Sequence, residues 1–236
     1  MGYVSRRFGV SLHQRCILII QITVYRFLLV SISIEVILSQ ATIRRRRKKL
    51  EEMARGDGFG DFYDYLINRI KKEGKRESKL GMDVLLWVLH SERPLHAEEL
   101  CYALGVETGS DDQDLEGAHS LQTVLSSCQG LVIVEPSSSI VRPLHFSLRV
   151  SLLNHPTLFP TPHSMIAEIC LTCLNFRSFW DLSPTPDSAS PAIPFREYAS
   201  CYWLKHARRG ITENVETLAQ RFLNRRATQF GLRLLD

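Results

Sequence analysis

Residues 80–153 constrain the fold of this chain more than any other stretch. They begin LGMDVLLWVLHSERPLHAEELCYALGVE and end GLVIVEPSSSIVRPLHFSLRVSLL. Around Trp87, apolar residues recur at helical spacing and widen to nearly the whole circumference, which predicts a buried helix. After a turn, a second helix is expected to start at His96 or Ala97 and to stop at Gly105.

The second half of this stretch changes from a helical to an alternating pattern. A third helix is expected at 119–127. Two β-branched runs, 132–135 and 140–144, flank a Pro-Ser-Ser-Ser turn and predict a hairpin. A closing helix is expected at 146–153. Three helices, a hairpin and a last helix predict a winged-helix domain, and the helical patterns on both sides predict a mainly α protein.

The flanking segments predict the domain organisation. We expect an unplaced segment at 1–25, a helical segment at 26–79, the winged helix at 80–158 and a second helical region at 159–236. In the last region, Ser164 is the expected N-cap of its first helix, since serine hydroxyls accept hydrogen bonds from free amides there.

The segment 26–79 carries a run of six basic residues, 44–49, on an expected helix capped by Thr42. Glu51 and Glu52 follow at once, so we interpret the run as a solvated face, with Ile43, Leu50 and Met53 turned inward. A nuclear-localisation or nucleic-acid patch is the alternative interpretation.

Further along, three glycines at 56–60 predict a turn, because the Gly-Lys-Ser/Thr ending of a phosphate loop is missing. Asp61 is expected to cap the next helix and Gly74 to end it. The segment 75–79, KRESK, is expected to be an exposed link.

Charge argues against DNA binding by the winged helix. The net charge is only +4, and the expected third helix contains no Lys or Arg. The loop before it carries four carboxylates, which would repel a polyanion. They are Asp111, Asp112, Asp114 and Glu116. We therefore expect this surface to contact protein.

The apolar run 16–38 leaves two interpretations open. It is long enough to span a bilayer, but Gln21, Arg26 and Glu35 lie within it, and charges inside a membrane are costly. We favour a buried helix or strand over a membrane segment, and a cytoplasmic protein whose six cysteines are reduced.

No residue set has the spacing of a catalytic or metal site. Cys170 and Cys173 supply half of a zinc site, but no second pair stands at ligand spacing, so core packing is expected for them and for Cys101 and Cys128. Gly-x-Ser-x-Gly, His-Glu-x-x-His and Walker motifs do not occur in the sequence. We expect no enzymatic activity, metal or cofactor from this chain alone.

Whole phrases of the sequence resemble the fungal NACHT–ankyrin proteins, which are nucleotide-switch ATPases of the NOD-like receptor type. LGMDVLLWVLHSERPLHAEELCYALGVE resembles the winged-helix domain named after the GPI inositol-deacylase, a name that implies no deacylase activity. RFLLVSISIEVIL with TIRRRRKKLEEM resembles the helical end of the NACHT module. PHSMIAEICLTCLNF and YASCYWLKHARR resemble the stretch that leads into ankyrin repeats. The resemblance covers 26–226.

This resemblance implies a fragment that works with a NACHT module and ankyrin repeats, supplied in cis or in trans. In related switch ATPases a histidine after the winged-helix strands contacts the phosphate of bound ADP. His145 occupies the matching place, so the resemblance implies a nucleotide contact there when a NACHT module is present. The aspartate that usually follows is Phe146, and a usual Glu-Tyr-Leu is Val150, Ser151 and Leu152.

Overall fold

The structure is a computed structural model that describes residues 30, 34, 37–54, 59–112, 119–155, 157–180 and 193–229. The chain divides into two compact units, Met1–Tyr65 and Leu66–Asp236. In the described ranges it is mainly helical, with one two-stranded sheet. The finer four-part division expected from the sequence stays a prediction, and most of the apolar run 16–38 lies outside the described residues.

In the first unit, α2 (Ile43–Ala54) confirms the expected helix and its cap. The Thr42 hydroxyl accepts the N–H of Arg45 at 3.3 Å. The inward orientation of the apolar residues is wrong, since Ile43 is 71% exposed and Leu50 56% exposed. Arg46 folds back instead, and its guanidinium donates to the backbone carbonyls of Leu38 and Gln40. The side chain of Met53 lies outside the described set.

The boundary between α3 (Phe59–Lys72) and α4 (Lys75–His90) differs from expectation. Asp61 lies within the first turn of α3 and does not precede the helix. The KRESK segment is exposed, as expected, but it forms the first turn of α4 after Gly74. Its lysines, arginine and glutamate are good helix formers, so the helix extends outward beyond its buried part.

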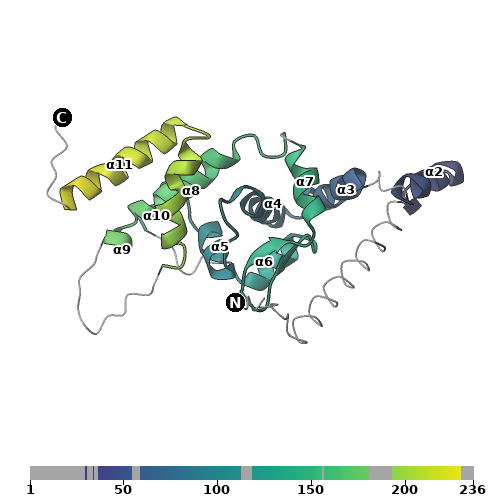
Figure 1. Cartoon of the computed structure of the whole chain (residues 1–236), viewed down its shortest axis with the longest axis horizontal. Helices are drawn as coiled ribbons and strands as arrows, with labels where there is room; N and C mark the ends of the chain where they lie inside the picture. Colours follow the sequence, from purple (N-terminus) through teal and green to yellow (C-terminus); the bar gives the residue numbers. More distant parts are fainter. Residues whose placement is uncertain are drawn as a thin grey trace, which may run out of the picture. The chain divides into compact units, whose positions relative to one another are not determined.

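The second unit is organised around α4, seen nearly end-on in Figure 1 and contacted by α5 (Ala97–Leu104), α6 (Leu121–Ser127) and α7 (Phe146–Leu153). The expected burial of α4 is confirmed, since Val84 and Leu85 are 0% exposed and Trp87 is 1% exposed. Burying each such side chain contributes roughly 1.5–3 kcal/mol.

The predicted hairpin is confirmed. Strands β1 (Val132–Val134) and β2 (Val141–Pro143) pair antiparallel, with Val132 opposite Pro143. On the other side of β2, the turn between α4 and α5 adds a further backbone contact: Val141 donates to the Leu95 carbonyl at 2.8 Å, and His96 bridges Ile140. The chain after α4 therefore lies beside the hairpin.

Four helices follow: α8 (Pro162–Asn175), α9 (Arg177–Trp180), α10 (Arg196–Ala207) and α11 (Glu213–Gln229). Both α10 and α11 pack against α8 (Figure 1). Ser164 is not the cap of α8, because the helix starts at Pro162, a residue suited to the first helical position. The Ser164 hydroxyl donates instead to the Gly210 carbonyl at 3.0 Å, which joins α8 to the turn before α11.

Gly81 of α4 lies close to the backbone at the end of α6. A Cβ added there would overlap the Ser127 carbonyl oxygen and would lie 2.9 Å from a methyl carbon of Ile70. We expect Gly81→Ala to lower the free energy of unfolding by about 1–3 kcal/mol, measured by urea denaturation. Arg76→Ala, at an exposed position of the same helix, should change it by less than about 0.5 kcal/mol. A stabilised Gly81→Ala variant would contradict this packing of α4 against α6.

Candidate interaction site

Helix α7 is apolar on two opposite faces. Leu148 and Leu152 are buried against the rest of the unit, at 1% and 3% exposure. Phe146, Val150 and Leu153 are 72%, 56% and 45% exposed on the other side. At about 100° per residue these three positions fall within one narrow sector of the helix, which we call the α7 outer face. A helix of this kind is suited to being covered on both sides.

A cavity of about 110 Å³ adjoins α7. Its walls come from the end of α4, the following turn, β2 and α7 itself. Three arginines line it, Arg93, Arg142 and Arg149, and we call it the arginine pocket. Apolar side chains, among them those of Trp87 and Leu95, complete the lining. A lining that combines arginines with apolar side chains is suited to an anionic group attached to a hydrocarbon.

Arg93 is the most firmly held of the three arginines. Its two terminal nitrogens donate to both oxygens of Glu99, at 2.7 and 2.8 Å, and its guanidinium lies 5.3 Å from the ring centre of Tyr198. Burial alone would raise the pKa of Glu99, but the hydrogen bonds from Arg93 and from the His96 backbone N–H lower it below its usual value. Glu99 therefore stays ionised and fixes one wall of the pocket.

The other two arginines are held less tightly. Arg142 lies 3.4 Å from a carboxylate oxygen of Glu135. Arg149 is exposed on α7, and the structure gives it no ion pair within the described ranges. Glu92 also lines the pocket, but its carboxylate pairs with Arg209 and Lys205 outside the pocket. The pocket therefore retains a positive excess near Arg149.

His145, the site residue predicted from the sequence, is the N-cap of α7. Its Nδ1 accepts the backbone N–H of Ser147 at 3.2 Å and lies 2.6 Å from the Ser147 hydroxyl. Burial lowers the pKa of His145, which favours the neutral ring that this cap requires. A ligand phosphate would have to be reached through Nε2. His145 is thus a half-buried histidine that ties strand β2 to helix α7.

A series of hydrogen-bonded polar groups, which we call the histidine chain, adjoins the pocket at Glu92 and was not predicted from the sequence. The Glu92 backbone N–H donates to the Tyr198 hydroxyl at 3.0 Å, and that hydroxyl lies 2.9 Å from Nε2 of His206. Nδ1 of His206 lies 2.9 Å from Nδ1 of His163. Since the hydroxyl accepts from Glu92, we assign its hydrogen to His206 Nε2, so that Nδ1–H of His206 donates to His163.

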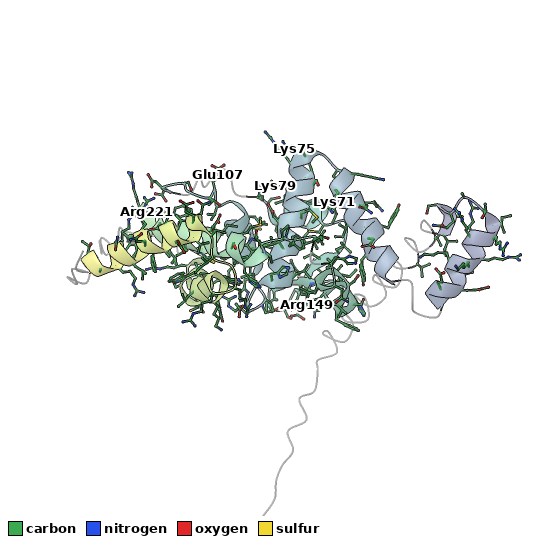
Figure 2. The ribbon with its side chains drawn as sticks, turned by 90° about the horizontal axis from the view of Figure 1, so that it is seen from above. Lys71, Lys75, Lys79, Glu107, Arg149 and Arg221 are labelled. Carbon is green, nitrogen blue, oxygen red and sulfur yellow. The ribbon has the colours of Figure 1, made fainter. Side chains whose placement is uncertain are left out.

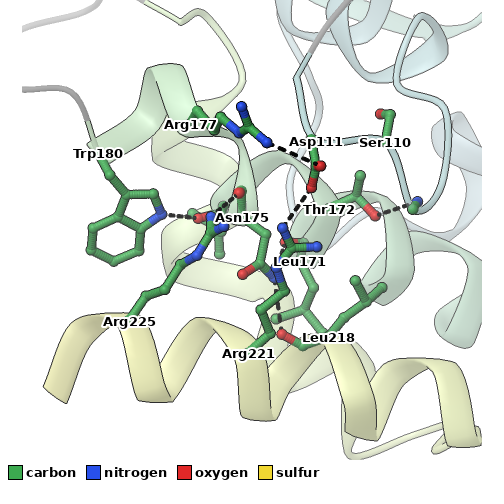
Figure 3. Close-up of polar contacts among 12 residues, drawn as sticks. Ser110, Asp111, Leu171, Thr172, Asn175, Arg177, Trp180, Leu218, Arg221 and Arg225 are labelled. Atoms are coloured by element: carbon green, nitrogen blue, oxygen red, sulfur yellow. Dashed lines mark hydrogen bonds and ion pairs between the residues drawn. The ribbon is translucent and has the colours of Figure 1, made fainter. Parts of the chain in front are cut away.

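Figure 3 shows a second network, centred on Asp111 in the loop after α5. Arg177 of α9 and Arg221 of α11 both reach its carboxylate. These arginines lower the pKa of Asp111, with the hydrogen bond from Arg221 as the largest cause. The acidic loop, predicted as part of a surface that contacts protein, therefore uses one of its carboxylates to hold the C-terminal helices.

The cysteines of α8 pack in the core, as predicted. Cys170 and Cys173 are both 0% exposed, and burial raises the pKa of each thiol. Cys128 is buried as expected, whereas Cys101 is only half-buried.

In the part of the chain that the structure describes, His, Cys, Asp and Glu side chains form no group suited to hold a metal ion. No helix built from described residues has the length and apolar character needed to cross a bilayer.

Comparisons with protein-family models, with curated proteins and with solved structures found no match to this chain. The site therefore has to be interpreted from its own geometry. The sequence located His145 and the hairpin but missed the arginine pocket, whose lining residues come from four separate segments. The α7 outer face did leave a local signal, because the apolar residues of FSLRVSLL fall on two opposite faces of a helix.

The histidine chain makes stability depend on pH. Burial is the main cause that lowers the pKa of His90 and of His206 to about 4, and the neighbouring His163 contributes in both cases. Between about pH 6.5 and 4 the unfolded chain then binds more protons than the folded one. We expect the free energy of unfolding to fall as pH falls through this window.

Urea denaturation of the full chain at a series of pH values measures this slope. His206→Gln should make this slope shallower. Equal slopes for the wild type and His206→Gln would show that His206 does not titrate differently on folding.

Proposed function

We propose that this chain is a non-catalytic regulatory module of a NACHT-type signalling ATPase, acting in the cytoplasm. In this proposal a winged-helix domain docks through the α7 outer face on a nucleotide-binding module and couples its state to downstream repeats. The observation that carries the proposal is the exposure of Phe146, Val150 and Leu153 on a helix whose opposite face is buried.

The arrangement of the second unit supports a winged helix. Three helices precede the hairpin, one follows it, and the segment between α4 and α5 bridges β2 as a third, very short strand would. The exposed residues of α6 include Gln122, Thr123 and Ser126, which are uncharged. A groove-reading helix would be expected to bring Arg or Lys to phosphates, so protein contact is favoured over DNA contact.

The energetics of the α7 outer face also favour a protein partner. Fully covering a large apolar side chain contributes roughly 1.5–3 kcal/mol. The three residues of the face are adjacent, so one partner surface could cover them together, as in the apolar centre of a protein interface. The sequence resemblance supplies the candidate partner, a NACHT-type module in cis or in trans.

We expect Phe146→Ser together with Val150→Ser to weaken binding of the chain to a recombinant NACHT-type module by about tenfold or more. The physical reason is the smaller apolar area that the partner can cover. Isothermal titration calorimetry measures the affinity. Leu204→Ser is the matched control, because Leu204 is 44% exposed on α10, away from this face. Equal affinities for the double variant and the wild type would contradict docking through α7.

The cofactor part of the proposal concerns His145. ADP or ATP would be bound only with a NACHT module present, with Nε2 of His145 near a phosphate. His145→Ala removes both the ring and the cap, whereas His145→Ser keeps a capping oxygen. We expect both variants to weaken ADP binding by a longer protein that carries the NACHT module, as measured by fluorescence titration. Unchanged affinity in both would exclude the contact, and weaker binding in His145→Ala alone would assign the effect to the cap.

Nucleic-acid binding by α2 is the second candidate function. Arg44, Arg45, Arg47 and Lys48 are exposed. These cations lie near the N-terminus of α2, where the positive end of the helix dipole repels them, and Glu51 and Glu52 lie near the negative C-terminal end. A bound polyanion would offset the repulsion at the N-terminus. The membrane-anchored alternative rests on the run 16–38 and mostly concerns residues outside the described ranges.

This second candidate predicts salt-dependent binding of the full chain to duplex DNA or RNA. Changing the four exposed cations to glutamine should lower the slope of log affinity against log salt by about 1 for each phosphate that the variant no longer neutralises. Fluorescence anisotropy at several salt concentrations measures this slope. An identical slope for the wild type and the variant would remove α2 as a nucleic-acid site.

A further inference from the structure

We propose that the α7 outer face and the arginine pocket form one binding site for an acidic amphipathic helix. The apolar side of that helix would cover Phe146, Val150 and Leu153, and one Asp or Glu side chain would enter the pocket beside Arg149. The inference rests on the proposed docking function and names the chemistry of the partner.

Arg149 connects the two parts of the site. It lines the pocket and also lies on α7, one position before Val150 and three after Phe146. At about 100° per residue it is roughly 60° from Phe146 around the helix, at the edge of the outer face. A helix that covers the face therefore brings its flanking residues to the mouth of the pocket.

The charges in the pocket favour a carboxylate. Glu99 neutralises Arg93, Glu135 lies beside Arg142, and the Glu92 carboxylate is engaged by Arg209 and Lys205. Arg149 has no such partner among the residues that the structure describes. A guanidinium binds a carboxylate with two parallel hydrogen bonds, which are strongest beside apolar walls such as Trp87 and Leu95.

The size of the pocket admits a side chain. A cavity of about 110 Å³ has room for a carboxylate and its hydrocarbon stem. One water needs about 10–15 Å³ of such space. An acidic side chain can therefore enter the pocket while its backbone stays outside, over the α7 outer face.

Two other occupants fit less well. A second copy of this chain, paired antiparallel through α7, would bring Arg149 close to its own counterpart, and like charges repel. An anionic membrane is flat, whereas the pocket is concave and carries the acidic residue Glu92 in its lining. The exposed lysines Lys75 and Lys79 lie on the opposite side of the view in Figure 2 from Arg149, so they do not extend this basic surface.

A display library of short amphipathic helices tests the proposal. The peptides carry leucine at i, i+3, i+4 and i+7, with all other positions random, and are selected against the full chain. We expect the enriched peptides to share Asp or Glu at one position beside the leucines. Arg149→Glu should weaken their binding about tenfold or more. A peptide with Arg in place of its acid should regain binding to Arg149→Glu.

The controls separate this inference from the docking function. Binding abolished in Phe146→Ser but unchanged in Arg149→Glu would overturn the acidic partner and leave the docking face. Binding unchanged in both variants, or no enriched peptide, would overturn the acidic helix, and calorimetry with the NACHT-type module would decide the docking function separately. Light scattering that shows a dimer abolished by Phe146→Ser, or phosphatidylserine vesicles that bind the wild type but not Arg149→Glu, would also overturn the acidic helix. Both residues are exposed, and circular dichroism checks that the variants fold.

Discussion

The second unit depends on one aromatic cluster, in which Trp87 of α4 contacts residues from the start of α10. The Trp87 ring meets those of Phe195 and Tyr198 edge-on, at 5.4 and 5.8 Å between centres, and Tyr102 of α5 stacks on Phe195 at 6.4 Å. Such pairs add about 0.5–1.5 kcal/mol each to the energy of burial. Because they join segments about a hundred residues apart, the hairpin region and the C-terminal helices lie in one compact unit.

The same cluster positions the polar groups around it. Tyr198 has one face against Arg93 of the pocket, and its hydroxyl lies between Glu92 and His206. Tyr198 therefore connects the arginine pocket to the histidine chain. Glu92 takes part in both, because it lines the pocket and its backbone N–H donates to the Tyr198 hydroxyl. A change in the protonation of His206 would act on the residue that also borders the pocket.

Local signals predicted much of this fold. The Thr42 cap, the hairpin, the buried α4 and the closing helix all follow from periodicity and turn chemistry within short windows. The errors arose where a distant contact decides the outcome: Ser164 bonds to Gly210 and Arg46 turns back on Leu38 and Gln40. The pocket and the histidine chain could not be predicted, because their residues are adjacent only after α4, β2, α7, α8 and α10 have packed. A single sequence carries no record of such adjacency.

The buried thiols of α8 have a use that follows from their position. Cys170 and Cys173 lie in the face of α8 that packs inward, whereas Cys201 is exposed on α10. A thiol reagent reaches an exposed cysteine at once, but it reaches a buried one only when the surrounding helices separate. The rate at which the α8 thiols are alkylated, relative to Cys201, would report how often this helical layer opens. Cys170 and Cys173 would thus report local unfolding, and the alkylation rate of Cys201 would serve as the reference.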